Sequence, residues 1–170
     1  MKKKGIVILS VVVVLALCIV FAAVFYGKKG TTKGEENVQD TSAVTEGKSL
    51  IISTSEVTEN AIFVPVEVDG TKMEVIAVRG SDGAIRTAFN TCQICYDSGN
   101  GYYVQDGAFF VCQNCGNRFT VDDIETKSGG CNPWPIFEED KKVTDETVEI
   151  SYDFLVKSKD IFKNWKGQFE

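Results

Sequence analysis

Four of the six cysteines in this 170-residue chain form two Cys-x-x-Cys pairs, and the chain contains no histidine. Cys92 and Cys95 make the first pair, and Cys112 and Cys115 make the second. When two such turns face each other, four thiolates converge, and four sulfurs at about 2.3 Å satisfy a tetrahedral zinc ion. The same ligands satisfy an iron–sulfur cluster. The spacing therefore predicts a thiolate site and leaves its metal open.

Two other uses of these thiols compete with a metal site. Disulfides suit an exported domain, but the five cysteines from Cys92 onward would leave one unpaired. A redox relay needs a Cys-x-x-Cys thiol with a lowered pKa. Such units carry one pair at a strand-to-helix junction, whereas this chain has two pairs around a predicted hairpin. A metal or cluster site is the favoured interpretation, and the other two stay open.

The N-terminal region predicts a membrane anchor. Met1–Lys4 is basic, and Ile6–Tyr26 is a run of 21 residues without charge, long enough to span a bilayer at about 1.5 Å per residue. The run exceeds the core of a cleaved signal, so residues 1–27 are predicted to be an uncleaved transmembrane signal anchor. Cys18 lies inside it and is interpreted as a buried apolar thiol. The basic tail favours a cytoplasmic N-terminus, which places the following domain outside the cytoplasm.

The remainder divides into a tether and a domain. Residues 28–48 are rich in Gly, Thr, Glu and Lys and lack aromatic residues, which predicts a flexible linker. Residues 49–170 predict a mainly β, extracytoplasmic, Cys-rich metal-binding domain with small antiparallel sheets, because Asp-Gly turn signals separate β-rich runs. The expected turns are Asp69-Gly70, Asp82-Gly83 and Asp106-Gly107, and the last expected strand is Val148–Ser151.

A short C-terminal helix is expected after that strand. The apolar residues that fall on one helical face there are Phe154, Leu155, Ile161, Phe162 and Trp165. They are predicted to pack in the core. Earlier in the chain, GGCNPWPIF combines two glycines and two prolines and is predicted to be a constrained loop.

Several functional classes are disfavoured by what the sequence lacks. Without histidine there is no Ser-His-Asp or Cys-His set, and no Gly-rich phosphate loop is present. The net charge of −6 does not suit a nucleic-acid binder, which would show a basic face. A non-enzymatic electron-transfer or metal-binding protein is favoured over an enzyme.

The cysteine loops resemble those of Rieske iron–sulfur domains, in which two Cys/His loops hold the cluster and a third, proline-rich loop covers it. TCQIC and CQNCGNRF stand in place of the two loops, and GGCNPWPI stands in place of the cover. Rieske loops place two histidines on one iron, which raises the potential. Cys95 and Cys115 occupy those positions here, so the resemblance implies a low, plant-ferredoxin-like potential. The first loop is one residue longer than the Rieske pattern.

The cover-loop resemblance places Cys131 against the two pairs. Gly129 and Gly130 allow a close backbone approach with positive φ, and Pro133 and Pro135 stiffen the loop. Cys131 is then expected to be an alternate ligand, a fifth thiol near the metal, or a resolving thiol that forms a disulfide when metal is absent. A buried thiol that merely packs is the alternative.

From about Ile62 to Ile136 the chain closely resembles the membrane iron–sulfur proteins described as FtrD-like. The resemblance is carried by VEVDGTKMEVIAV, SDGAIRTAFNTCQICYDSGNGYY, VCQNCGNRF and GGCNPWPI. It implies a membrane-anchored metal or iron–sulfur protein associated with iron transport. The ligands that it implies are Cys92, Cys95, Cys112 and Cys115, with Cys131 as a fifth participant. Larger members carry many more membrane spans, so a permease role does not extend to this chain.

These observations together predict a single-pass cell-membrane protein with a thiolate centre in its extracytoplasmic domain. We expect it to transfer electrons or handle metal beside a membrane redox or metal-transport partner, with no role for nucleic acid. The expected cofactor is an iron–sulfur cluster, with zinc as the alternative. The competing function is a structural zinc or disulfide-stapled interaction module.

Overall fold

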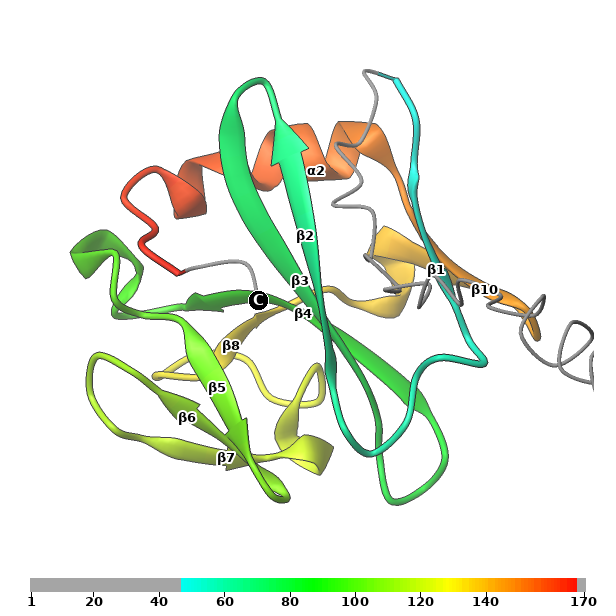
Figure 1. Ribbon diagram of the computed structural model, residues 1–170, viewed down its shortest axis with the longest axis horizontal. Coiled ribbons are helices and arrows are strands. Elements are labelled where there is room, and N and C mark those ends of the chain that lie inside the picture. The colour runs from blue at the N-terminus through cyan, green and yellow to red at the C-terminus, as the bar shows by residue number, and fades with distance from the viewer. Residues whose placement is uncertain (1–46, 168–170) are drawn as a thin grey trace, which may run out of the picture. The chain divides into compact units, whose positions relative to one another are not determined.

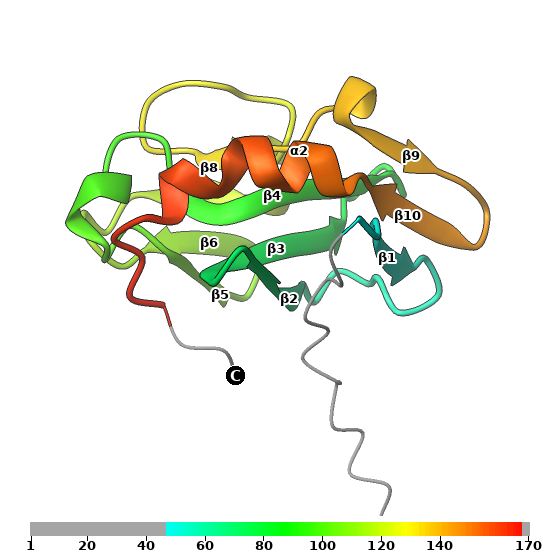
Figure 2. The same ribbon diagram turned by 90° about the horizontal axis from the view of Figure 1, so that it is seen from above.

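The computed structural model describes residues 47–167, drawn in colour in Figures 1 and 2. The predicted anchor of residues 1–27, Cys18 within it, and nearly all of the predicted linker 28–48 lie outside the described residues. Within residues 47–167, no helix is long and apolar enough to cross a membrane. The anchor therefore stays a prediction.

The described residues form three antiparallel sheets, with strand orders β1-β10-β9, β2-β3-β4-β8 and β5-β6-β7 (Figure 1). This arrangement confirms the predicted mainly β class with small antiparallel sheets. The strands are β1 (Leu50–Ser53), β2 (Ile62–Val68), β3 (Thr71–Arg79), β4 (Ile85–Cys92), β5 (Tyr103–Asp106), β6 (Phe109–Cys112), β7 (Arg118–Thr120), β8 (Pro133–Pro135), β9 (Lys141–Val143) and β10 (Thr147–Ile150). The last strand thus lies one residue before its predicted position.

The hairpin of β2 and β3 forms where the Asp-Gly signal predicted it. Val68 pairs with Thr71, so Asp69 and Gly70 are the two central residues of the turn. Both have positive φ, 49° and 75°, as a tight hairpin that matches the twist of its strands requires. The β5–β6 hairpin turns after Asp106, which pairs with Phe109, so Gly107 and Ala108 are its central residues and only Gly107 has a positive φ, 60°. The β3–β4 connection also contains its predicted glycine, Gly83, at φ 83°.

The proline-rich segment departs from its predicted loop conformation. Pro133–Pro135 forms strand β8, which pairs with β4 through Ala88–Pro135, Phe89–Trp134 and Cys92–Pro133. Proline lacks the N–H that an interior strand must donate, and β8 is accordingly an edge strand. The residues of GGCNPWPIF that precede Pro133 do form a loop, as predicted. The pairing brings the residue two positions after Cys131 directly opposite Cys92.

Two apolar clusters lie on the two faces of the central strands. Met73, Val75 and Ala77 of β3 belong to the first cluster, and Ile76 and Val78 belong to the second. This alternation follows the two-residue period of a strand, and it shows that β3 is buried on both faces. The second cluster contains Cys92, Cys95 and Cys112.

The helix α2 (Tyr152–Ser158) covers the first cluster and continues as a 3-10 helix, η4 (Lys159–Phe162) (Figure 2). Ser151 caps it, because its hydroxyl accepts a hydrogen bond from the Phe154 N–H at 3.2 Å. Phe154 and Phe162 both contact the ring of Phe89 on β4, with centroids 5.7 Å apart in each pair. The short C-terminal helix and its role in core packing are confirmed, although Trp165 lies beyond the helical residues.

Candidate metal centre

The first cysteine pair lies where β4 ends. Cys92 is the last residue of β4, and Cys95 precedes the 3-10 helix η1 (Tyr96–Ser98). The Cys95 backbone N–H points at the Cys92 sulfur, with a nitrogen–sulfur distance of 3.2 Å. The Cys92 N–H donates to the Gly101 carbonyl at 2.6 Å. The chain therefore folds back on itself around these two thiols.

The second pair repeats this arrangement at the end of β6. Cys112 is the last residue of β6 and pairs with Tyr103 of β5. Its N–H donates to the Asn117 carbonyl at 2.9 Å, and the Gly116 N–H donates to the Cys112 carbonyl at 2.8 Å. Gly116 has a φ of 73°, a conformation that favours glycine. The turn closes because of that glycine, and it leaves Cys115 at the exposed tip.

The loop that carries Cys131 is tied to the first pair through Gln93. The Gln93 N–H donates to the Asn132 carbonyl at 3.1 Å, and the Gln93 amide oxygen accepts from the Gly129 N–H at 3.0 Å. The Gln93 amide nitrogen donates to the Pro133 carbonyl at 3.2 Å. One side chain between the first two cysteines thus holds both ends of the third loop, and Cys131 lies between those ends.

The five sulfurs gather into two overlapping groups of three. Cys92, Cys95 and Cys112 form one group, and Cys95, Cys115 and Cys131 form the other. Within each group all sulfurs lie within 4.8 Å of one another. The structure therefore brings together the four cysteines of the two pairs and adds Cys131, and Cys95 is common to both groups.

Exposure falls from the outer group to the inner one. Cys115 is exposed and Cys131 is half-buried, whereas Cys92 and Cys112 are 0% and 1% exposed. Cys95 joins the two groups at 9% exposure. The inner group is enclosed by protein, and the outer group is open to solvent or to a partner.

The local environments shift the thiol pKa values in opposite directions. Burial raises the pKa of Cys112 to about 12. Burial and the neighbouring Cys115 raise the pKa of Cys131. Burial also opposes ionisation of Cys92, but hydrogen bonds from the Tyr103 hydroxyl and from backbone N–H groups lower the pKa of Cys92 below its usual value. A bound cation would override these pKa shifts, because a thiol that ligates a metal is deprotonated.

The donor set fits a thiolate metal centre. Two sulfurs bound at about 2.3 Å to one tetrahedral ion lie roughly 3.8 Å apart, a separation that the 4.8 Å limit within each group accommodates. Cysteine thiolates are also the usual ligands of iron–sulfur clusters. None of the five cysteines in residues 47–167 is joined in a disulfide. The chemistry of the donors thus suits either an iron–sulfur cluster or zinc.

Tyr103 and Gln93 contact the site although the sequence patterns did not single them out. Tyr103 is 1% exposed, and its hydroxyl donates to the Cys131 carbonyl oxygen. Burial and the adjacent Cys92 sulfur raise the pKa of Tyr103, so the phenol stays protonated and can donate. Its position between the two pairs, at the start of a predicted strand, was the only available signal.

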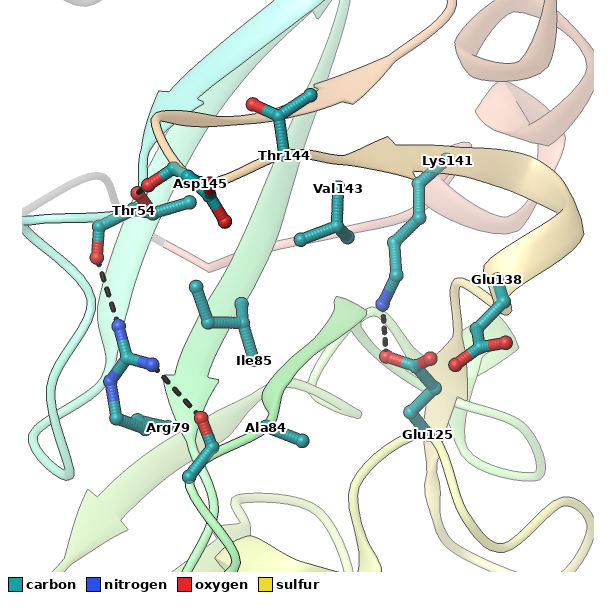
Figure 3. A pocket seen from close by; sticks show the side chains of 11 residues that line it. Thr54, Arg79, Ala84, Ile85, Glu125, Glu138, Lys141, Val143, Thr144 and Asp145 are labelled. Carbon is teal, nitrogen blue, oxygen red and sulfur yellow. Dashed lines mark hydrogen bonds and ion pairs between the residues drawn. The ribbon is translucent and has the colours of Figure 1, made fainter.

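A separate hollow of about 580 Å³ contains no cysteine among its lining residues. Figure 3 shows that Arg79 and Lys141, the two cations that line it, are bonded to other groups of the protein. Arg79 donates to the backbone carbonyls of Val57, Thr54 and Gly83, and Lys141 pairs with Glu125. These contacts hold the β3–β4 turn and β9 in place. They give both cations a structural role.

Comparison with known proteins gives one match. The family model described as "Membrane iron-sulfur containing protein FtrD-like" matches residues 57–162, a range that contains all five cysteines of the site. No curated protein and no solved structure matches the chain, so the predicted Rieske-like fold stays a prediction.

Proposed function

Because the chain belongs to the FtrD-like family of membrane iron–sulfur containing proteins, we propose that its five-cysteine site holds an iron–sulfur centre. The proposal places the centre outside the cytoplasm, on a single-pass anchor, where it passes electrons to a membrane redox or metal-transport partner. The convergence of five thiols in two groups that share Cys95 carries the proposal. No other described group of metal-ligating side chains gathers in this way.

The two sulfur groups would have different roles. Cys92 and Cys112 lie at the ends of paired elements and are enclosed, so they are suited to permanent ligation. Cys115 is exposed, so it marks the edge where a partner can approach. A bound iron–sulfur centre would supply one-electron chemistry at that edge.

The surroundings of the site favour a low potential. Residues 92–95, 112–117 and 128–136 contain no charged side chain, and Arg118, which ends the second loop, is paired with Asp106 at 2.9 Å. No lysine or arginine within those three ranges offsets the negative charge of the thiolates. Because a cluster's potential depends on net charge, hydrogen bonds to sulfur and exposure, four-cysteine ligation here favours the oxidised form. The backbone N–H bonded to the Cys92 sulfur acts in the opposite sense.

A metal-handling role is the second candidate, and the open outer group supports it. Cys95, Cys115 and Cys131 offer three sulfurs within 4.8 Å, and two of these residues are not fully buried. Such a group can take up or release an ion without opening the enclosed one. In this role the partner would be a metal transporter.

Anaerobic purification of the full chain in detergent tests the proposal. A bound cluster absorbs visible light, whereas zinc-bound and disulfide forms are colourless. We expect a coloured protein whose visible absorption disappears in Cys92→Ser. A colourless protein that contains zinc would instead support the structural interaction module.

A further inference from the structure

The C-terminal end of the described chain contacts the loop that follows Cys95. Residues 164–166, here called the clamp, begin two residues after the end of η4 and reach residues 97–99. The hydrogen bonds are Lys166 N–H to the Gly99 carbonyl at 2.8 Å, Lys166 Nζ to the Ser98 carbonyl at 3.2 Å and Asn164 Nδ2 to the Asp97 carbonyl at 3.1 Å. Every carbonyl of this three-residue stretch is therefore occupied by the clamp.

The contact at Gly99 is too close for any other residue. Gly99 has a φ of 76°, and a Cβ built on it would lie 2.0 Å from the Asn164 carbonyl oxygen. A real Cβ would force the two segments apart. Gly99 thus permits both the left-handed end of η1 and the approach of the clamp.

Trp165 fixes the clamp to the strand that leads into the first cysteine. Its indole N–H donates to the Asn90 carbonyl oxygen at 2.8 Å, two residues before Cys92. Its ring packs edge-on against Phe162 and Tyr102 at centroid distances of 5.6 and 6.4 Å. The clamp therefore holds both sides of the first cysteine pair.

Asn90 extends this connection toward the third cysteine loop. Its side-chain oxygen accepts from the Tyr103 N–H at 2.6 Å, and the Tyr103 hydroxyl donates to the Cys131 carbonyl. Asn90 itself is 2% exposed. A continuous set of hydrogen bonds thus runs from Trp165 to the loop of Cys131.

We propose that the clamp holds the first cysteine loop closed and thereby sets how slowly the centre releases its metal. This inference rests on the proposed function, because it concerns retention of the same centre. The clamp lies beyond residue 162, where the family match ends. In this role Asn164, Trp165 and Lys166 are positioning residues, since none of them contributes a sulfur ligand.

The physical reason is that Cys95 can leave the centre only if its loop moves. The Ser98 N–H donates to the Cys95 carbonyl at 3.1 Å, so residues 97–99 and Cys95 form one tightly bonded turn. Fixing those residues from outside raises the free energy of any state in which the Cys95 sulfur swings away. Cys95 belongs to both sulfur groups, so its displacement would open both.

The experiment compares metal release from the full chain in detergent after addition of EDTA. The test variant is the double substitution Asn164→Ala and Trp165→Phe, which removes two side-chain donors and keeps an aromatic ring. Gly99→Ala attacks the same contact from the opposite side. The matched control is Lys163→Ala, an exposed neighbour whose side chain makes no hydrogen bond or ion pair in the described structure.

We expect both clamp variants to release metal about tenfold faster than the wild type, as the loss of one or two hydrogen bonds allows. Amide hydrogen exchange at residues 96–101 should accelerate in the same variants. Lys163→Ala should match the wild type in both measurements. Release and exchange that stay at wild-type rates in both clamp variants would overturn the proposal.

Failure of the clamp and failure of the proposed function give different results. A wild-type chain that carries no metal contradicts the proposed function, yet exchange at residues 96–101 of the metal-free chain still tests the clamp. A metal-bearing wild type with unchanged release in both variants contradicts the clamp alone. If a variant unfolds at a lower temperature, faster amide exchange in β3 as well identifies a global loss of stability. In that case only an acceleration confined to residues 96–101 supports the clamp.

Discussion

The Tyr103 hydroxyl donates a hydrogen bond to the backbone carbonyl oxygen of Cys131, 28 positions further along the chain. The same hydroxyl lies beside the Cys92 sulfur, whose pKa it helps to lower. The Tyr103 hydroxyl therefore lies where the first and third cysteine loops meet. This relationship explains how a proline-rich loop far along the chain is held against the two cysteine pairs.

Tyr103→Phe should loosen the Cys131 loop while leaving the ring packing intact. The substitution leaves a carbonyl without its donor, and the free energy of unfolding should fall by about 1–3 kcal/mol. Urea denaturation measures the change. The neighbouring Tyr102→Phe is the matched control, because its hydroxyl makes no hydrogen bond in the described structure, and it should stay close to the wild type. Equal losses in the two variants would contradict the role given to Tyr103.

Cysteine substitutions should differ in severity according to the two sulfur groups. Cys95→Ser should abolish metal retention, because Cys95 belongs to both groups. Cys92→Ser and Cys112→Ser should do the same, since both lie in the enclosed group. Metal analysis of each purified variant measures the effect. Full metal content in Cys95→Ser would show that the overlapping groups do not act as one centre.

Cys115→Ser should retain part of its metal, because Cys131 lies in the same outer group and can take its place. The double substitution of Cys115 and Cys131 to Ser should lose it. Cys131→Ser alone is the control, because it removes the alternate ligand and leaves Cys115 in place. A Cys115→Ser variant as empty as the double variant would mean that Cys131 cannot substitute. The same measurement decides whether Cys131 is an alternate ligand or a packing thiol.

Breaking the pair between Lys141 and Glu125 should destabilise the fold strongly. Their side chains are 2% and 12% exposed, and Glu125 also accepts from the Thr87 N–H at 2.9 Å. Lys141→Met leaves a buried carboxylate without its cation, at a cost of roughly 3–5 kcal/mol. The pair of Lys127 and Asp123, whose side chains are 63% and 20% exposed, is the control, and Lys127→Met should cost about 1 kcal/mol or less because its cation lies in solvent. Similar losses in the free energy of unfolding at both positions would show that burial of the ion pair does not set the cost of breaking it.

The pair of Asp82 and Arg86 should make stability depend on acid pH. Hydrogen bonds from Arg86 hold the pKa of Asp82 well below its usual value of 3.8. A depressed pKa contributes stability that is present above the unfolded-state value and is lost as pH falls through the folded-state value. The difference in stability between wild type and Asp82→Asn should therefore be constant above about pH 5 and shrink below pH 3.8. A difference that grows on acidification would have the wrong sign.

Local sequence signals were sufficient for the hairpins and for the gathering of thiols. Asp69-Gly70 predicts its turn because both positions need positive φ, and two Cys-x-x-Cys turns around a hairpin predict converging sulfurs. The β8 strand was missed because its two prolines are typical of loops. Only the pairing with β4, far back in the sequence, makes the segment an edge strand.

The remaining parts of the site depend on contacts that no local pattern contains. The Trp165 indole bonds to a carbonyl 75 positions away, and its residue type predicted only core packing. In the sequence, Gln93 is one of the two unspecified residues inside a Cys-x-x-Cys pair. In the structure it forms hydrogen bonds with residues 129, 132 and 133. Which residues meet across such separations is decided by the packing of the sheets as a whole.

The iron and acid-labile sulfide content of the full chain, purified without oxygen, tests the central claim most directly. The proposed centre predicts that both are present together and that both are lost in Cys95→Ser. Zinc without sulfide, or four of the five cysteines recovered in two disulfides with no metal, would contradict an iron–sulfur centre at this site.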